Sequence, residues 1–381
     1  MSNAPPRASN SIRRQRLRQG IRSASPRYAE TVKLTADDLI GGVRGRRFCF
    51  GFAAGTAAMP PGAVKLIQDA ANRIDTKRGR GGSRYWRPTE ISEEMEPEFP
   101  KLTPGLSISE LGARFETVQL GAVTPKNLFE NLASCVDEAV YWEAPDGLDD
   151  LLREPAMHSA LRRIAAHVLA SPETDWWSTP MAGDQWTVEF TDTTFEPVER
   201  PPAELAHRLW IDEGRYDRGW WSKPSWSMTR SSRALPGFGP LDLTLVEDSF
   251  GWRRADACAV VVPQNARVFE IVSGSSWAEL CKRYPLRRTD VSEWAISTGF
   301  TGNWVIPDWG KVARDYDAVH LTAGAYLSTA GVPIHLDAGT ASIIAGWEPD
   351  VTFWMTDVEV DRLSLQRWTD DDEAWEWRLE N

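Results

Sequence analysis

The sequence predicts an α+β protein, in which an N-terminal helical region precedes a mixed or antiparallel, Trp-rich sheet domain with short helices. Three observations predict this fold class. Apolar residues recur at helical spacing before residue 175, whereas short β-branched and aromatic runs follow Trp176. Seventeen of the 19 tryptophans lie from Trp176 onward. The helices expected between these runs are few and short, which argues against a doubly wound sheet.

The composition divides the 381 residues into four parts. Residues 1–35 are rich in Ser, Pro and Arg and are expected to form a flexible basic arm. Residues 36–175 form the mainly helical region, with a basic loop at 77–87, and residues 176–360 form the sheet-rich domain. Residues 361–381 are an acidic tail with two tryptophans, which is either loosely docked or a clamp on the basic segment.

Three helices are expected in the first region. Residues 63–75 follow Pro60-Pro61-Gly62 and place their apolar side chains on one face. Residues 124–142 begin with Thr124 as N-cap and Pro125 at the first helical position, and apolar residues recur every four positions. Residues 155–170 carry a third apolar stripe.

Strands are expected where β-branched and aromatic residues form short runs. These runs are 185–192, 241–248, 257–263, 267–273, 317–322, 341–346 and 351–357. Two short helices are expected between them, at 276–284 and at 309–316, and Asp308 is a candidate cap for the second. No repeat of fixed period is visible, which argues against a propeller or a solenoid.

The net charge of −11 conceals an asymmetry. Residues 1–87 hold 18 Lys and Arg against 5 Asp and Glu, and the rest of the chain holds 25 against 49. A basic N-terminal segment predicts phosphate contacts with nucleic acid or another anionic partner, and the alternative is contact with the acidic remainder of the same chain. The candidate nucleic-acid-binding residues are Arg13, Arg14, Arg16, Arg18, Lys77, Arg78, Arg80 and Arg84.

Several classes of protein are disfavoured. No apolar run is long enough to span a membrane, and residues 1–47 lack the apolar segment of a secretory signal, so we expect a cytoplasmic protein without a membrane partner. The four cysteines are widely separated and are expected to be reduced and buried. The five histidines allow no zinc site of familiar spacing, so no metal is expected. P-loop, nucleophile-elbow and zincin motifs are missing from the sequence.

Two segments between residues 206 and 232 carry candidate chemistry. His207 can transfer a proton near neutral pH and Arg208 can hold a phosphate, although both also suit an ordinary surface. The segment 218–232 interleaves indoles, hydroxyls and cations. This composition is typical of a ligand-binding edge, and the alternative is an aromatic lid over the core. Its candidate cofactor-binding residues are Trp220, Trp221, Ser222, Lys223, Trp226 and Arg230.

Two further segments carry titratable side chains that could take part in chemistry. In VEDSFGW at 246–252, Glu247 and Asp248 end a run before a turn, and adjacent strand residues point to opposite faces, so their adjacency implies no paired acid and base. In 302–331, His320 shares a strand face with Thr322, and Tyr326 follows in a turn or short helix. His320 is either a catalytic residue or a core histidine with satisfied hydrogen bonds.

Long segments of the chain resemble, in order, a family of uncharacterised actinobacterial proteins over about residues 135–356. The matching segments are WWSTP at 176–180, WWSKPSWSMTR at 220–230, VEDSFGW at 246–252, ARVFEIVSGSSWAELCKRYP at 266–285, 298–331 and AGWEPDVTFWM at 345–355. The order of a His-bearing segment, a Trp-Ser strip, W-x-x-L-x-x-x-Y-P and a D-Y-D-A-V strand is also similar to the plan of ADP-ribosyltransferase-like folds.

That second resemblance implies an enzyme that splits NAD at the ribose, as a transferase or an NAD glycohydrolase. It implies that His207 or Arg208 fills the first catalytic position and that Ser222 with Trp220 or Trp221 forms the second. No Glu-x-Glu or Gln-x-Glu motif marks the third position, for which Glu270 and Glu247 are substitutes by position. His320 completes the candidate catalytic set, and Thr322 and Tyr326 complete the cofactor-binding set.

Two hypotheses therefore remain open. The first is an NAD- or nucleotide-binding, ADP-ribosyltransferase-like enzyme with a basic arm for an anionic partner. The alternative is a non-enzymatic nucleic-acid-binding or interaction protein, in which tryptophans stack on bases or build the core. Carbohydrate binding is a third interpretation, which the lack of a secretory signal disfavours. Convergence of His207, Ser222, Glu270 and His320 on one cleft would support the enzyme.

Overall fold

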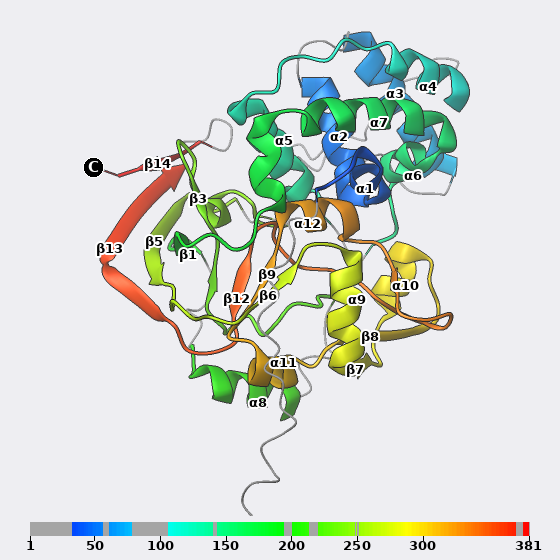
Figure 1. Cartoon of the computed structure of the whole chain (residues 1–381). Coiled ribbons are helices and arrows are strands. Elements are labelled where there is room, and N and C mark those ends of the chain that lie inside the picture. The colour runs from blue at the N-terminus through cyan, green and yellow to red at the C-terminus, as the bar shows by residue number, and fades with distance from the viewer. Residues whose placement is uncertain are drawn as a thin grey trace, which may run out of the picture. The chain divides into compact units, whose positions relative to one another are not determined.

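A computed structural model describes residues 33–55, 61–77, 106–139, 143–193, 200–212, 220–247, 249, 251–370 and 376–380. It confirms the α+β class, because helices dominate the N-terminal part and several small sheets follow (Figure 1). Most of the predicted arm lies outside these residues. Within the arm, Thr35 accepts a hydrogen bond from the Asp38 amide and caps the first helix.

The helical region contains seven α-helices among the described residues, followed by the 3₁₀ helix η1 (Pro172–Ser178). The three predicted helices correspond to α3, α5 and α7, and Thr124 caps α5 as expected. Helix α5 ends at Asp137, and residues 140–142 of the predicted helix lie outside the described part. The helices are α1 (Ala36–Gly41), α2 (Val43–Gly55), α3 (Pro61–Lys77), α4 (Ile108–Glu116), α5 (Pro125–Asp137), α6 (Gly147–Arg153) and α7 (Pro155–Leu169).

The sheet-rich region holds three four-stranded sheets and a short hairpin. The first sheet has the order β1-β5-β13-β14 and is antiparallel throughout. The other two, β10-β11-β8-β7 and β2-β12-β9-β6, each contain one parallel pair. The predicted mixed or antiparallel pairing is therefore confirmed.

The strands are β1 (Gln185–Phe190), β2 (Arg230–Ser231), β3 (Ala234–Leu235), β4 (Gly239–Pro240), β5 (Arg254–Val261), β6 (Val268–Ile271), β7 (Pro285–Arg288), β8 (Asn303–Pro307), β9 (Ala318–Leu321), β10 (Ile334–His335), β11 (Thr340–Ser342), β12 (Thr352–Trp354), β13 (Glu359–Asp370) and β14 (Trp377–Leu379). Short helices connect them: α8 (Ala203–Asp212), α9 (Gly274–Arg283), α10 (Ser292–Thr298), α11 (Trp309–Asp315) and α12 (Ala323–Thr329). Asp308 caps α11 as predicted, by accepting from the Lys311 amide.

Two segments differ from expectation. The strand expected at 241–248 is wrong, because residues 241–243 form the 3₁₀ helix η3 (Leu241–Leu243). Its leucines alternate with polar residues as in a half-buried strand, but Asp242 and Thr244 are buried as well. The predicted acidic tail contains most of β13 and the whole of β14, which extend the first sheet (Figure 1).

One hydrophobic core joins the helical and sheet regions. Helix α12 makes the connection, since it packs against α1 and α2 on one side and against α9 on the other (Figure 1). All four cysteines are buried free thiols, as predicted. Seven tryptophans are among the fully buried side chains, so much of the tryptophan content builds the core: Trp177, Trp277, Trp294, Trp304, Trp309, Trp347 and Trp354. No helix in the described parts has the length and apolar character needed to cross a membrane.

Candidate functional site

The described part of the Trp-Ser strip, residues 220–232, lies beside the distant segment 345–354. Ser222 donates its amide to the Ala345 carbonyl at 2.9 Å, and the Ser222 hydroxyl accepts from the Ala345 amide at 3.1 Å and from Trp347 Nε1 at 3.3 Å. Farther along, β2 pairs with β12. Ser222 is therefore a buried hydrogen-bonding centre that holds these two segments together.

Two cations of the strip meet one carboxylate. Lys223 Nζ and Arg230 Nη1 lie 3.4 and 2.7 Å from Glu348 Oε1, and Arg230 Nε lies 3.6 Å from Asp242 Oδ2. The two acids are almost fully buried, whereas the side chains of Lys223 and Arg230 remain 21% and 23% exposed. The strip thus presents two partly exposed cations whose charges are balanced by the buried carboxylates of Glu348 and Asp242.

The two carboxyl groups respond differently to this burial. Burial raises the pKa of Asp242 to about 6, against the lowering effect of Arg230. Burial also opposes ionisation of Glu348, but Lys223 and Arg230 outweigh it and hold its pKa below the usual range. Within the described residues, neither oxygen of Asp242 has a hydrogen-bond partner. Asp242 is therefore a buried acid that changes charge near neutral pH.

Glu270 and His320 are brought together on neighbouring parallel strands. Their backbones are in register on β6 and β9, and His320 Nδ1 lies 2.6 Å from Glu270 Oε2. On its other side, His320 Nε2 lies 3.3 Å from Asp350 Oδ1. Arg233 then holds Asp350 through Nε and Nη2, each at 2.7 Å. A buried chain of alternating charges, Glu270–His320–Asp350–Arg233, results.

These four side chains stabilise one another's charges inside the protein and are not placed to contact a substrate. Burial disfavours the imidazolium, but Glu270 and Asp350 outweigh it and raise the pKa of His320 to about 9. Both ring nitrogens are occupied and the side chain is 0% exposed. Glu270 Oε1 also accepts from the Met181 amide at 3.0 Å. Both oxygens of Glu270 are therefore engaged inside the protein.

The remaining expected catalytic and cofactor residues lie elsewhere. His207 and Arg208 are on α8, where His207 Nε2 contacts the Met355 carbonyl at 2.9 Å and burial lowers its pKa. Arg208 is exposed. Thr322 caps α12, and Tyr326 donates to Glu247 Oε1 at 2.7 Å. Of the four residues expected to share one cleft, hydrogen bonds join Glu270 with His320 but connect His207 and Ser222 to other partners.

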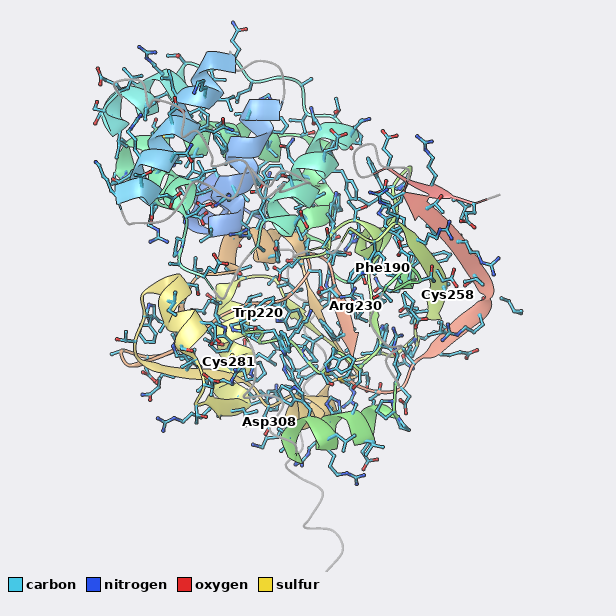
Figure 2. The ribbon with its side chains drawn as sticks, turned by 180° about the vertical axis from the view of Figure 1, so that it is seen from behind. Phe190, Trp220, Arg230, Cys258, Cys281 and Asp308 are labelled. Carbon is cyan, nitrogen blue, oxygen red and sulfur yellow. The ribbon has the colours of Figure 1, made fainter. Side chains whose placement is uncertain are left out.

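The tryptophans of the strip differ in exposure. Trp226 is 54% exposed and Trp221 is 36% exposed. Trp220 packs against the core, and its carbonyl accepts from Trp294 Nε1 at 2.6 Å (Figure 2). Only Trp221 and Trp226 of these three rings therefore have a substantially open face for stacking.

A hollow lined by aromatic rings lies at the end of β1, outside the strip. It has a volume of about 240 Å³, and we call it the aromatic pocket. The Phe190 and Trp252 rings stack with centroids 4.5 Å apart, and the centroids of the Trp377 and Phe190 rings are 5.9 Å apart. Its lining residues are Phe190, Leu243, Thr244, Val246, Ser249, Gly251, Trp252, Arg253, Asp370 and Trp377.

Part of this pocket was visible in the sequence. Val246, Ser249, Gly251 and Trp252 belong to the VEDSFGW segment, for which the sequence predicts the end of a strand and a turn. Phe190 ends a predicted strand and Trp377 lies in the acidic tail, so only tertiary structure shows that they meet. The Glu247 side chain, hydrogen-bonded to Tyr326, directly follows the lining residue Val246.

Helix α5 fixes the walls of the aromatic pocket. The Ser249 amide donates to Asp137 Oδ1 at 2.9 Å. Lys126 Nζ lies 2.7 Å from Glu376 Oε1, next to the lining residue Trp377. Both contacts originate from one helix, so the helical region positions the two segments that contribute Trp252 and Trp377.

The expected nucleic-acid-binding residues are mostly outside the described part of the chain. Lys77 is the last residue of α3. The other seven residues, Arg13, Arg14, Arg16, Arg18, Arg78, Arg80 and Arg84, lie beyond the described ranges, and their role stays a prediction. Among the described His, Cys, Asp and Glu side chains, no group of three or more is placed to hold a metal ion.

Comparisons of the chain with protein-family models, with curated proteins and with solved structures find no match, so a functional assignment rests on the geometry above.

Proposed function

We propose that the protein binds a nucleotide of the NAD class, and that the aromatic pocket receives one of its planar rings. One observation carries the proposal: three aromatic side chains from separate segments, Phe190, Trp252 and Trp377, line one 240 Å³ hollow. Pockets that bind small molecules combine apolar and aromatic walls with a few polar groups that orient the ligand. The proposal therefore places the ring in this concave pocket and not on the Trp-Ser strip.

The polar lining residues suit the remainder of a nucleotide. Arg253 is exposed at the pocket and offers a guanidinium, which binds phosphate through a planar fork. Thr244, Ser249 and Asp370 offer oxygen atoms that match ribose hydroxyls. The volume lies below the roughly 300–1,000 Å³ typical of pockets for drug-sized ligands. The pocket therefore takes one end of a dinucleotide and leaves the other end in solvent.

Chemistry at the ribose is part of the same proposal and requires a carboxylate near the bound ring. A carboxylate stabilises the positive charge that develops when the bond between ribose and base breaks. Of the two expected glutamates, Glu247 is the better candidate by position, because it directly follows the lining residue Val246; its own side chain does not line the pocket, and its Oε1 accepts from the Tyr326 hydroxyl. Glu270 is the weaker one, since His320 and the Met181 amide occupy its oxygens.

The binding proposal is tested by calorimetry and thermal unfolding with NAD, ADP-ribose and nicotinamide. A ligand at ten times its Kd adds about 1.4 kcal/mol of stability and should raise Tm by a few degrees. Trp252→Ala should abolish the shift. Trp226→Ala is the matched control, because it removes an exposed indole from the strip and should leave the shift intact. Loss of binding in Trp226→Ala alone would place the site on the strip.

The chemical step needs its own measurement, because binding and turnover can fail separately. NAD should be converted by the wild-type chain to a free or transferred ADP-ribosyl product and nicotinamide. Glu247→Gln should reduce that rate by about a hundredfold or more while retaining the NAD-induced Tm shift. Glu270→Gln should retain turnover in whatever fraction of the chain remains folded. A rate that survives Glu247→Gln would remove this residue from the reaction.

A further inference from the structure

A second hollow lies on the opposite face of the β1–β5 pair, and a cysteine lines it. The hollow has a volume of about 150 Å³ and is lined by Thr187, Glu189, Asp256, Cys258, Arg362 and Leu365. We call it the thiol pocket. Thr187 and Cys258 are opposed in the antiparallel register, so their side chains share one face of the sheet. Figure 2 shows Cys258 on β5, beside β13.

Two polar groups of the thiol pocket have unused hydrogen-bonding capacity. Thr187 is 3% exposed, and its hydroxyl has no hydrogen-bond partner among the described residues. A buried hydroxyl left without a partner is unfavourable, so an occupant that accepts from it is favoured. Arg362 likewise forms no hydrogen bond or ion pair with the described side chains, and its guanidinium lines the same hollow. Both groups point to an oxygen-bearing ligand.

The charges around Cys258 leave one cation in excess. Glu189 and Asp256 are cross-strand neighbours, and each has an arginine of its own. Arg200 lies 3.0 Å from Glu189, and Arg367 lies 3.9 Å from Asp256. Burial lowers the pKa of Arg200, and the positive charges of Arg230 and Arg362 lower it further, against the effect of Glu189. Arg362 therefore remains as a cation of the thiol pocket without a carboxylate partner among the described residues.

The other three cysteines provide an internal comparison. Cys49 and Cys281 are 0% exposed, and Cys135 and Cys258 are each 3% exposed, but of these four cysteines only Cys258 lines the thiol pocket or the aromatic pocket. Burial raises the pKa of all three thiols, to about 12 for Cys135 and Cys281 and further for Cys49. These three thiols are therefore inert at neutral pH, whereas Cys258 has both a hollow above it and polar neighbours.

We propose that the thiol pocket is an oxidation site, in which a small hydroperoxide reacts with Cys258. The Cys258 thiolate attacks one peroxide oxygen, an S–O bond forms and the O–O bond breaks. The departing oxygen keeps the bonding electron pair, takes a proton and leaves as water or an alcohol. The sulfur is oxidised by two electrons to sulfenic acid, and the peroxide is reduced.

Thr187 and Arg362 have distinct roles in this step. Arg362 stabilises the negative charge on the departing oxygen, while the Thr187 hydroxyl donates to the bound peroxide. A low-molecular-weight thiol completes the cycle. The first equivalent forms a mixed disulfide with Cys258 and releases water, and a second equivalent releases the Cys258 thiol and a small disulfide. The site binds no part of the nucleotide, so it is independent of the aromatic pocket.

The test measures oxidation at all four cysteines of the full-length chain. The native protein is treated with hydrogen peroxide, sulfenic acid is trapped with dimedone, and each cysteine peptide is quantified by mass spectrometry. Cys258 should be labelled at least tenfold more than Cys49, Cys135 or Cys281. Equal labelling of all four thiols, or labelling of Cys258 only after denaturation, would overturn the proposal.

Variants separate simple accessibility from a built site. Arg362→Ala should slow peroxide oxidation by about tenfold or more, because it removes the positive charge that stabilises the departing oxygen. Arg314→Ala removes an exposed arginine of α11 and is the matched control. Thr187→Val should slow peroxide oxidation much more than alkylation by iodoacetamide. Thr187→Ser keeps the hydroxyl and should restore the rate of peroxide oxidation. Equal effects on both reactions in Thr187→Val would contradict the role of the hydroxyl.

Discussion

His320 is held as a cation inside the protein by a carboxylate at each ring nitrogen. A buried charge of this kind is tolerated only when partners compensate the loss of water. Glu270 and Asp350 provide that compensation, and Arg233 in turn balances Asp350. The four residues belong to separate segments of the chain, so this charge chain specifies how β6, β9 and the segment around 350 come together.

The His320 charge makes stability depend on pH in a defined window. The folded pKa of about 9 lies above the ordinary value of 6.5, so the stabilisation is fully present below about pH 6.5 and is lost as pH rises through 9. That displacement corresponds to roughly 3 kcal/mol. Urea unfolding of the wild-type chain should show this decline. His320→Gln should be less stable at pH 6 and should lack the decline, and an unchanged pH slope in the variant would contradict the charged state.

Asp242 should affect stability in a lower pH window than His320. Its contribution also declines as pH rises, but here the cause is that burial disfavours the charged form. Its folded pKa of about 6 exceeds the ordinary 3.8, so its contribution is favourable below pH 3.8 and is lost as pH rises through 6. Asp242→Asn should remove that loss and stabilise the protein near pH 8 by about 1–3 kcal/mol. Thermal unfolding across pH 4–8 measures the effect. A destabilised Asp242→Asn protein at pH 8 would mean that the ion pair with Arg230 outweighs the burial cost.

Close helix packing in the N-terminal region depends on glycine at particular positions. A Cβ added at Gly112 of α4 would lie 2.1 Å from the Ala156 carbonyl oxygen of α7, and that backbone atom has little room to move. Gly112→Ala should therefore destabilise the protein by about 1–3 kcal/mol. Gly62→Ala in α3 is the control, because nothing lies within 4 Å and alanine should stabilise that helix by about 0.5–1 kcal/mol. Chemical unfolding should give opposite signs, and equal signs would contradict the packing argument.

Elements with strong local signals were predictable from sequence. Thr124 with Pro125 marked the start of α5, and Asp308 marked the start of α11, because caps and fixed backbone angles act within a few residues. Helix α2 was missed because Arg44, Arg46 and Arg47 interrupt its apolar pattern. Two of these arginines have distant partners, since Arg44 donates to the Cys135 carbonyl and Arg47 to Asp149.

The candidate sites were only partly predictable, because the residues that form them come from segments far apart in the sequence. His320 and Glu270 were singled out separately, and the parallel register of β6 and β9 makes them neighbours. Asp350 could not be connected to them, because it lies in a turn, where its own φ is 63° and no strand register predicts its neighbours. Thr187, Cys258 and Arg362 come from three strands of one sheet, two of them more than a hundred residues from the third in sequence. Local patterns carry no information about such long-range register.

At the scale of the whole molecule, part of the N-terminal basic charge is neutralised within the fold. Arg47 lies within 3.1 Å of carboxylate oxygens of Glu138, Asp146 and Asp149, and it is only 6% exposed. Contact between the basic segment and the acidic remainder of the chain is therefore present for this residue. Deleting residues 1–87 to test nucleic-acid binding would also remove α1, α2 and α3, with core residues such as Phe48 and Phe52.

Nucleic-acid binding by the basic arm should instead be tested by charge substitution. Replacing Arg13, Arg14, Arg16 and Arg18 together by Ala leaves every described helix and strand intact. If these four side chains contact phosphates, the slope of log K against log salt should decrease in magnitude by about 3–4, because each contact releases roughly 0.7–0.9 counterion. Fluorescence anisotropy with labelled DNA and RNA at several salt concentrations measures the slope, and unchanged Tm verifies the fold. If the wild-type chain binds neither polymer at low salt, or if the variant keeps the wild-type slope, the arm has no phosphate-contacting role. The basic charge would then serve contacts such as those of Arg47 with the acidic remainder of the chain.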